Sequence, residues 1–240
     1  MTAARSTADG PTAGGAPKRD GPVVTLDGPA GSGKSTTARE VARRLGLRHL
    51  DSGALYRAMT FALLDAAIPA ERWHALSDEE LRSLGVDLEV TDDALRARVG
   101  GRVVGPELRT PEVTAKVSAL ARLPGPRRVL LDVQRAAGAR GRLVADGRDM
   151  GTVVFPDADV KVFLVAAVEE RARRRLGEAG VPRPTGRQLA DEIARISERD
   201  RTDTERDLSP LRAPVDARVV DTTALAFDEQ VRIIADLVRG

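Results

Sequence analysis

Residues 28–35, with the sequence GPAGSGKS, have the types and spacing that bind a phosphate chain. They match the pattern G-x-x-x-x-G-K-[ST], in which glycines let backbone N–H groups face the phosphates and a lysine reaches the β and γ phosphates. An apolar, β-branched run precedes the pattern at 23–27, and a helical pattern follows from Ser35. This context suits the motif, because a helix start adds about half a positive charge there. The sequence therefore predicts a nucleoside triphosphate site.

The contacts predicted for this site come from the loop and the start of its helix. Lysine is rare in this arginine-rich chain and occurs at positions 18, 34, 116 and 161. A lysine at position 34 therefore indicates that the chemistry of the loop requires this residue type. The Ser35 hydroxyl is predicted to hold Mg²⁺, directly or through water. Asp146, ending a predicted strand, is a second candidate for Mg²⁺, with a turn cap as its alternative. The predicted triphosphate contacts are Gly28, Pro29, Ala30, Gly31, Ser32, Gly33, Lys34, Ser35 and Thr36.

Arginines also gather far from this loop in the sequence. Arg171, Arg174 and Arg175 have the spacing of one helix face. A transferring phosphoryl group spreads negative charge over its oxygens, and the planar guanidinium binds such oxygens in pairs. The alternative is a solvated face paired with Glu169, Glu170 and Glu178. We favour a phosphate lid, with Arg171 predicted to bind the donor nucleotide.

Composition narrows the class of protein. A chain of 240 residues accommodates one sizeable α/β core with appendages. Without cysteine it has no disulfide or thiolate zinc site. No run approaches the roughly 18 apolar residues of a membrane span, and the start lacks a secretory signal, so we expect a soluble cytoplasmic protein. A net charge of +2 and 2% aromatic residues argue against a nucleic acid partner.

The elements that position these residues follow from hydrophobic periodicity. Short apolar strands are predicted at 23–27, 47–51, 143–146, 160–165 and 219–221. Helices between them imply a doubly wound parallel sheet of the α/β class. Alternating strands at 86–90, 95–99 and 102–104, after a short acidic helix at 77–84, predict a small antiparallel insert. Further helices are predicted at 52–67, from Pro111 to before Pro124, onward to about 137, and at 228–239.

Two stretches differ in composition from the rest. Residues 1–20 hold almost no large apolar side chain, so a disordered tail is expected. Residues 169–206 are polar and rich in arginine, and Pro182 and Pro184 divide them into two helical parts. This pattern predicts an exposed helical hairpin that serves as a lid.

Four segments together resemble the bacterial cytidylate kinase family, a group of P-loop nucleoside monophosphate kinases. They are the loop at 28–35, DSGALYR at 51–57, ADGRDMGTVVFPDA at 145–158 and ERD at 198–200. The resemblance extends from about Gly21 to the end of the chain, and the third segment is long and unusual. It implies a monomeric enzyme that transfers the γ-phosphoryl group of ATP to CMP or dCMP with Mg²⁺. It also implies a core at 21–57, 139–168 and 207–240, a monophosphate-binding region at 58–138, and the lid at 169–206.

The resemblance assigns roles residue by residue. It implies phosphate transfer by Lys34, Arg148, Arg174 and Arg175, and a base-reading carboxylate at Asp149. The acceptor contacts that it implies are Ser52, Tyr56, Arg57, Ser118, Arg127, Arg148, Asp149, Arg199, Asp203 and Arg206.

Base choice has a chemical basis at these positions. Cytosine offers an exocyclic amino donor and a ring-nitrogen acceptor, which a carboxylate at Asp149 and a donor at Arg127 complement. Uracil would not satisfy this pair. The alternative for Asp149 is an ion pair with Arg148 or a lid arginine. Two departures from the family pattern are the stiff Gly125-Pro126 before Arg127 and the proline-containing linker at 177–188.

Histidine is not expected to act in catalysis. His49 lies in a predicted core strand and His74 in the insert, so both are interpreted as structural. An ionised acceptor phosphate needs no general base, so positioning and charge stabilisation are expected to supply the rate enhancement. The core, insert and lid are expected to close around the substrates and exclude water.

Two other functions compete with this interpretation. A kinase for UMP, AMP or shikimate would share the architecture, and only the set Ser118, Arg127 and Asp149 separates it. A nucleotide-dependent switch protein is the other alternative. We find no guanine-reading Asn-Lys-x-Asp sequence, and an arginine-rich lid suits phosphoryl transfer better.

Overall fold

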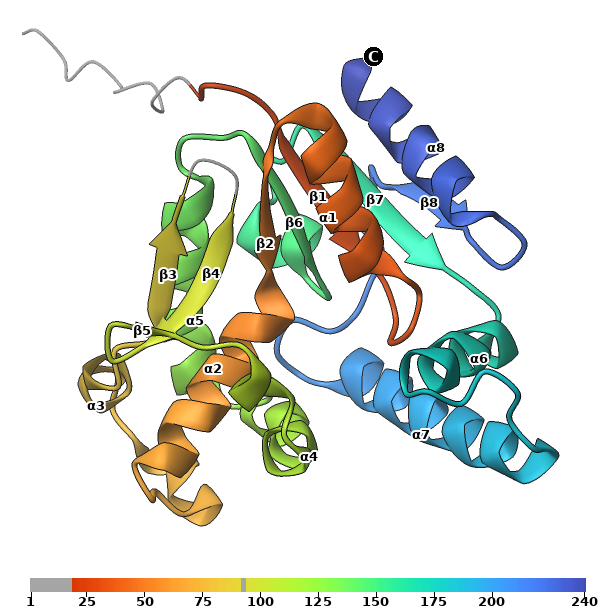
Figure 1. The fold of residues 1–240 in the computed structure, drawn as a ribbon. Helices are drawn as coiled ribbons and strands as arrows, with labels where there is room; N and C mark the ends of the chain where they lie inside the picture. Colours follow the sequence, from red (N-terminus) through yellow and green to blue (C-terminus); the bar gives the residue numbers. More distant parts are fainter. Residues whose placement is uncertain (1–18, 92–93) are drawn as a thin grey trace, which may run out of the picture.

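A five-stranded parallel sheet forms the centre of the computed structural model, which describes residues 19–91 and 94–240 (Figure 1). The strand order is β2-β6-β1-β7-β8, and every neighbouring pair is parallel. This confirms the predicted fold class. Most of the tail expected at 1–20, namely residues 1–18, lies outside the described residues. The strands are β1 (Val23–Asp27), β2 (Arg48–Asp51), β6 (Leu143–Gly147), β7 (Val160–Val165) and β8 (Arg218–Asp221).

Helices cover both faces of the sheet, as a parallel sheet requires. Every residue of β1 and β6 is buried. Because side chains alternate along a strand, Val24 and Leu26 pack on one face with α1 (Lys34–Leu45) and α8 (Phe227–Arg239). Val23 packs on the other face with α2 (Ser52–Asp65) and α5 (Pro124–Gly138). Within residues 19–91 and 94–240, no helix is long and apolar enough to cross a membrane.

The predicted insert forms beside α2. It consists of α3 (Asp78–Ser83) and a three-stranded antiparallel sheet of β3 (Asp87–Val90), β4 (Leu95–Val99) and β5 (Arg102–Val103). Residues 92–93, predicted as a turn, lie outside the described residues. Short 3₁₀ segments at Ala70–Ala75 and Pro106–Arg109 were not predicted.

Prolines mark the two helices that follow the insert. Pro111 is the first residue of α4 (Pro111–Leu120), and Pro124 is the first residue of α5. Pro126 also lies in the first turn of α5, where backbone N–H groups have no partner within the helix. The stiff Gly125-Pro126 sequence therefore fits the helix start and does not divert Arg127.

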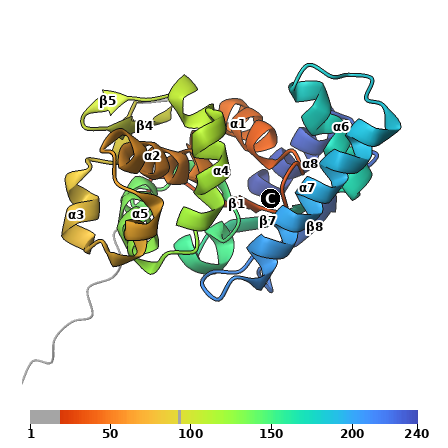
Figure 2. The same ribbon diagram turned by 90° about the horizontal axis from the view of Figure 1, so that it is seen from below.

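The predicted lid is a helical hairpin of α6 (Val168–Glu178) and α7 (Gly186–Glu205), which lie side by side in Figures 1 and 2. Pro182 and Pro184 lie in the loop between them, as predicted. Thr185 begins α7 through a capping box with Gln188. In Figure 2, the loop at the start of α1 lies between this hairpin and α4, so the hairpin and α4 flank the predicted phosphate site.

A π-helical turn, Met150–Val154, follows β6 and was not predicted. The N–H groups of Val153 and Val154 both donate to the carbonyl of Asp149, at 2.9 and 3.1 Å. Such turns are rare and occur often at functional sites. This one directly follows the two residues, Arg148 and Asp149, that the sequence assigns to the acceptor nucleotide.

Candidate active site

The phosphate-binding loop joins β1 to α1. Gly33, at the start of α1, has φ of 84°, a left-handed conformation that glycine adopts without strain. The Lys34 ammonium is buried and donates to the carbonyl of Pro29 at 3.0 Å. Burial, reinforced by the nearby positive charge of Arg148, lowers the pKa of Lys34 to about 7. A bound anion would favour the charged form of Lys34 and offset the cost of its burial, so the position is suited to binding an anion.

Asp146, Ser35 and His49 meet at the end of the neighbouring strands. The Ser35 hydroxyl donates to Asp146 Oδ2 at 2.5 Å, and His49 Nε2 forms a 2.7 Å hydrogen bond with Asp146 Oδ1. Burial alone would raise the pKa of Asp146, but the hydrogen bonds from His49 and Ser35 hold it below its ordinary value. His49, interpreted from the sequence as structural, thus contacts a predicted functional residue. Sequence reasoning missed this contact; in the parallel register His49 is opposite Val144, two residues before Asp146.

The chemistry of these side chains fits a magnesium ion. A hydroxyl and a carboxylate are hard oxygen donors, which Mg²⁺ prefers, and in nucleotide sites it takes few protein ligands besides phosphate and water. Over residues 19–91 and 94–240, no group of three or more His, Cys, Asp or Glu residues could hold a metal by itself. Ser35 and Asp146 are therefore suited to a metal that arrives with a nucleotide.

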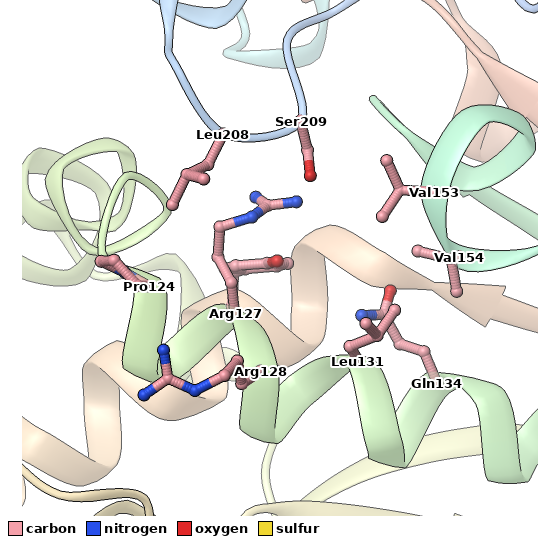
Figure 3. Close-up of a pocket in the computed structure, with 10 residues that line it drawn as sticks. Pro124, Arg127, Arg128, Leu131, Gln134, Val153, Val154, Leu208 and Ser209 are labelled. Carbon is pink, nitrogen blue, oxygen red and sulfur yellow. The ribbon is translucent and has the colours of Figure 1, made fainter.

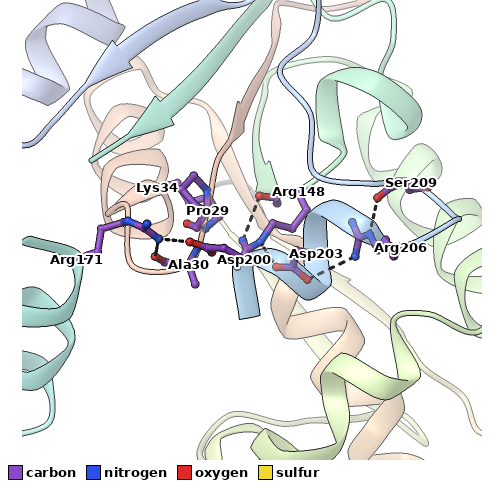
Figure 4. Close-up of polar contacts among 10 residues, drawn as sticks. Pro29, Ala30, Lys34, Arg148, Arg171, Asp200, Asp203, Arg206 and Ser209 are labelled. Atoms are coloured by element: carbon purple, nitrogen blue, oxygen red, sulfur yellow. Dashed lines mark hydrogen bonds and ion pairs between the residues drawn. The ribbon is translucent and has the colours of Figure 1, made fainter. Parts of the chain in front are cut away.

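Buried arginines crowd the space between the loop and the end of α7 (Figure 4). Arg148 Nε donates to Asp203 Oδ2 at 2.7 Å. Arg199 Nε and Arg206 Nη2 are buried and have no hydrogen-bond partner among the described residues. Burial and repulsion from Arg148 lower the pKa of Arg199 to about 10. Cationic donors that are desolvated and incompletely paired form an anion site.

Two lid residues hold the backbone of the phosphate-binding loop (Figure 4). Asp200 Oδ1 accepts from the N–H of Ala30 at 3.0 Å, and Arg171 Nη1 donates to the carbonyl of Ala30 at 2.9 Å. Arg171 also forms an ion pair with Asp200 and donates from Nε to the carbonyl of Ala166. The predicted contact of Arg171 with ATP stays untested, since here its side chain braces the loop. Sequence reasoning missed this role of Asp200.

The other two lid arginines lie against the same loop. Arg174 donates to the carbonyl and hydroxyl of Thr222, at 2.5 and 3.0 Å, and pairs with Glu170. Arg175 Nε lies 3.2 Å from Glu192 Oε1, and its Cδ would be 3.4 Å from a Cβ added to Gly31. Of the glutamates considered in the alternative to a phosphate lid, Glu170 pairs with Arg174, whereas Glu192 comes from α7 and was missed.

Residues assigned to the acceptor phosphate lie on α2. Ser52 is buried at its first position, and Asp51 caps the helix by accepting from the N–H of Ala54 at 3.0 Å. Arg57 Nη1 donates to the carbonyl of Leu108 at 3.1 Å and to the Thr114 hydroxyl at 2.9 Å. Burial and the neighbouring Arg109 lower the pKa of Arg57. These two hydrogen bonds therefore hold the Arg57 guanidinium in place.

The residues assigned to the base lie together. Arg127 forms a buried ion pair with Asp149, and its guanidinium carbon is 5.7 Å from the centre of the Tyr56 ring, in cation–π contact. Burial raises the pKa of Tyr56 to about 12. Arg127 also donates to the carbonyl of Ala121, one turn beyond Ser118 on α4. Asp149 thus pairs with Arg127, not with the arginines considered as its alternative partners.

A largely apolar cavity of about 220 Å³ opens beside this group (Figure 3). At ~30 Å³ for each water molecule, it has room for a ring-sized ligand next to the paired side chains. The Arg127 side chain rises from α5 into this space, toward Leu208 and Ser209. The lining residues are Tyr56, Pro124, Arg127, Arg128, Leu131, Gln134, Val153, Val154, Leu208 and Ser209.

Comparisons with known proteins show which family the chain resembles. The family model described as cytidylate kinase matches residues 24–240. A cytidylate kinase from Exiguobacterium sp. is 43% identical over 218 residues, which cover 90% of this chain and 95% of the relative. Another from Salinibacter ruber is 44% identical, covering 91% of this chain and 97% of the relative. The solved structure of a shikimate kinase from Bacteroides thetaiotaomicron has a TM-score of 0.47 and 15% identity, covering 91% of this chain and 98% of that chain.

Proposed function

The chain belongs to the cytidylate kinase family and phosphorylates CMP and dCMP with ATP, and on that premise we propose how its own residues perform the transfer. The observation that carries the proposal is the convergence of cationic side chains beside the phosphate-binding loop. Lys34 is buried, Arg148 is ion-paired with Asp203, and the buried Nε of Arg199 has no hydrogen-bond partner among the described residues. A nucleotide phosphate chain would bring negative charge to this group.

The donor nucleotide is held by the loop and by the start of α1. Backbone N–H groups between Gly31 and Thr36 face the phosphates, and Lys34 releases its bond to Pro29 to reach the β and γ phosphates. Ser35 and Asp146 would hold Mg²⁺, and His49 would orient the Asp146 carboxylate. When bound, Mg²⁺ would neutralise part of the negative charge of the phosphate chain.

The acceptor phosphate is held by arginine. Arg57, Arg148 and Arg199 bind its oxygens, and Asp203 and Arg206 hold the pentose side. An ionised oxygen of this phosphate attacks the γ phosphorus, the bond from γ phosphorus to the β–γ bridging oxygen breaks, and ADP leaves with that electron pair. No proton has to be removed from the nucleophile. Lys34, Arg148, Arg174 and Arg175 stabilise the charge on the transferring oxygens.

The base is read by exchange of partners. In the nucleotide-free protein Asp149 and Arg127 bind one another. When CMP binds, cytosine replaces Arg127 as the partner of Asp149 and Asp149 as the partner of Arg127. Its amino group donates to Asp149, and its acceptor atoms accept from Arg127. Ser118 adds a contact from α4. Uracil presents a carbonyl where Asp149 needs a donor, which leaves a buried carboxylate unpaired.

Closure completes the site. We assign residues 21–57, 139–168 and 207–240 to the core, 58–138 to the monophosphate-binding region and 169–206 to the lid. Approach of the two outer regions would bring the arginines of α2 and α6 to one phosphate chain and exclude water as a competing acceptor.

Two variants on one helix test the proposal. Arg199→Ala removes a buried cation, and Arg201→Ala removes an exposed one that is paired with Glu198 and Glu205. Loss of a charge-assisted hydrogen bond predicts a rise of about tenfold or more in the KM for CMP in the first variant. The second variant should stay within about twofold of wild type, since exposed ion pairs contribute little. Equal KM values in both variants would contradict the proposal.

A further inference from the structure

Asp27 connects the two halves of the active site. It is the last residue of β1, directly before the phosphate-binding loop, and its side chain is fully buried. Its Oδ1 accepts from the N–H of Met150 at 2.9 Å, and its Oδ2 accepts from the N–H of Gly151 at 2.8 Å. These two amides begin the π-helical turn that follows Asp149.

We propose that Asp27 is a positioning residue for base recognition, because its carboxylate fixes the turn that directs Asp149 toward the acceptor base. The inference rests on the proposed function, in which Asp149 reads cytosine. Asp27 itself touches neither nucleotide. It acts through the two backbone amides that directly follow the residue that does.

The geometry explains why a carboxylate is needed. Two neighbouring N–H groups point at one side chain, and only a carboxylate offers an acceptor oxygen to each of them. An asparagine would accept from one amide and turn its own NH₂ group toward the other. The same carboxylate holds both amides at once, so the direction of the peptide after Asp149 is fixed.

Stability alone does not account for this carboxylate. None of the described residues places a cation in hydrogen-bond contact with Asp27, and burial raises its pKa to about 6. A buried carboxylate of this kind is costly to the folded state, and its hydrogen bonds to the two amides of the turn offset that cost. The charge is therefore tied to the turn that it positions.

Close packing at Gly151 also restricts where the turn can lie against β1. A Cβ added at Gly151 would lie 2.8 Å from the Thr25 hydroxyl and 2.9 Å from the Pro214 side chain. On the other side of the turn, the Asp149 carbonyl accepts from Val153 and Val154. Asp149 is thus held by Asp27 through the following peptide and by the turn through its own carbonyl.

The phosphate-binding loop does not depend on this side chain in the same way. The backbone of Asp27 is paired with Gly147 of β6 on one side and with Phe163 of β7 on the other. These ladders hold the end of β1 whatever side chain is present. Loss of the carboxylate should therefore disturb recognition of the acceptor more than binding of ATP.

The variant Asp27→Asn tests the inference in steady-state assays with CMP, UMP and ATP. The expected result is a fall of about tenfold or more in the ratio of kcat/KM for CMP to that for UMP, with the KM for ATP within about twofold of wild type. Asp216→Asn, at an exposed carboxylate paired with Lys161, is the matched control and should change neither. An unchanged ratio for Asp27→Asn, or a change confined to the KM for ATP, would overturn the inference.

Asp149→Asn, alone and combined with Asp27→Asn, separates this inference from the proposed function. If both residues act on one recognition step, the double variant should discriminate no worse than Asp149→Asn alone. A ratio that falls with Asp149→Asn but not with Asp27→Asn overturns the positioning role only. A ratio unaffected by Asp149→Asn overturns the proposed base reading, and with it the inference.

Gly151→Ala is a second test of the positioning role that changes no residue of β1. Its added methyl group would push the same turn away from Thr25, which lies on the same face of β1 as Asp27, so the same loss of discrimination is expected. This variant decides the question if Asp27→Asn does not fold. Retained discrimination in a folded Gly151→Ala protein would then count against the positioning role.

Discussion

The chemistry of this site depends on individual charged side chains. Their charged groups are buried and have fewer hydrogen-bond partners than they could bind. Lys34 is surrounded by protein and repelled by Arg148, and Arg199 is buried with an unpartnered Nε. Both buried charges destabilise the nucleotide-free protein, and the negative charge of a bound phosphate would offset that cost. Affinity for phosphate is therefore prepared by the fold before the ligand arrives.

Nucleotide binding should take up a proton at Lys34. Its pKa in the free protein is about 7 against an ordinary 10.5, and a bound phosphate chain moves it back upward. At pH 8 roughly nine-tenths of the amines are neutral, so binding of ADP should take up close to one proton; below about pH 6 the uptake should vanish. ADP affinity should consequently fall as pH rises from about 7 toward 10.

Calorimetry in two buffers of different ionisation enthalpy measures this uptake, and it should be done without Mg²⁺ so that only the protein and ADP titrate. Lys34→Arg is the control, since a guanidinium stays charged over this range. No uptake by the wild-type protein at pH 8 would show that Lys34 is already charged in the free enzyme.

Arg199→Ala should affect stability only when CMP is present. Without nucleotide, the variant loses a desolvated charge that Arg148 repels, so its midpoint of thermal unfolding should equal or exceed that of the wild type. With CMP, a tenfold weaker affinity removes about 1.4 kcal/mol of ligand stabilisation, or about 4 °C at this chain length. Thermal scans with and without CMP test both parts. The same loss in both scans would assign Arg199 a structural role instead.

The motif residues could be predicted because each has a chemical reason to stand at its position. Lys34 begins α1 directly after the loop from β1, and Arg127 contacts both Tyr56 and Asp149. The brace of Ala30 by Asp200 could not be predicted, because it joins residues 170 positions apart. Such a contact depends on how the lid docks, and periodicity carries no information about docking.

At the scale of elements, the lid is attached to the core through the phosphate-binding loop. Both the N–H and the carbonyl of Ala30 are held by lid residues, the first by Asp200 of α7 and the second by Arg171 of α6. A shift of the hairpin would therefore alter the backbone of the predicted phosphate-binding loop.

Asp200→Ala should weaken the donor site. It removes the acceptor for the Ala30 N–H and the partner of Arg171, so we expect the KM for ATP to rise about fivefold to tenfold. The KM for CMP should change by less than about twofold. Asp191→Ala, at an exposed position of the same helix, serves as the control. A larger effect on CMP than on ATP would contradict the link between lid and loop.

Strands and helices with a clear period were predicted almost to the residue, because burial on one face imposes that period. β4 and the helix breaks at Pro124 and Pro182 are examples. The π-helical turn at Met150–Val154 has no such period. Its first two amides donate to Asp27, more than a hundred residues earlier, and periodicity gives no sign of such a contact.

At the scale of the whole molecule, strand order brings the chemistry together. The carboxyl ends of β1, β6 and β2 are adjacent, and they deliver the phosphate-binding loop, Asp146 and the start of α2 to one edge of the sheet. The monophosphate-binding region and the lid flank that edge (Figure 2). Residues from opposite ends of the chain thus surround one site.

One assay tests the central claim most directly. It measures ADP release from ATP and Mg²⁺ with CMP, dCMP, UMP, AMP or no acceptor, for the wild type and Lys34→Ala. We predict strong turnover with CMP and dCMP, little with the other acceptors, and a loss of at least about a hundredfold in the variant, because its central phosphate cation is gone. Turnover that ignores the acceptor, or that prefers UMP or AMP, would contradict the roles proposed for Arg127 and Asp149.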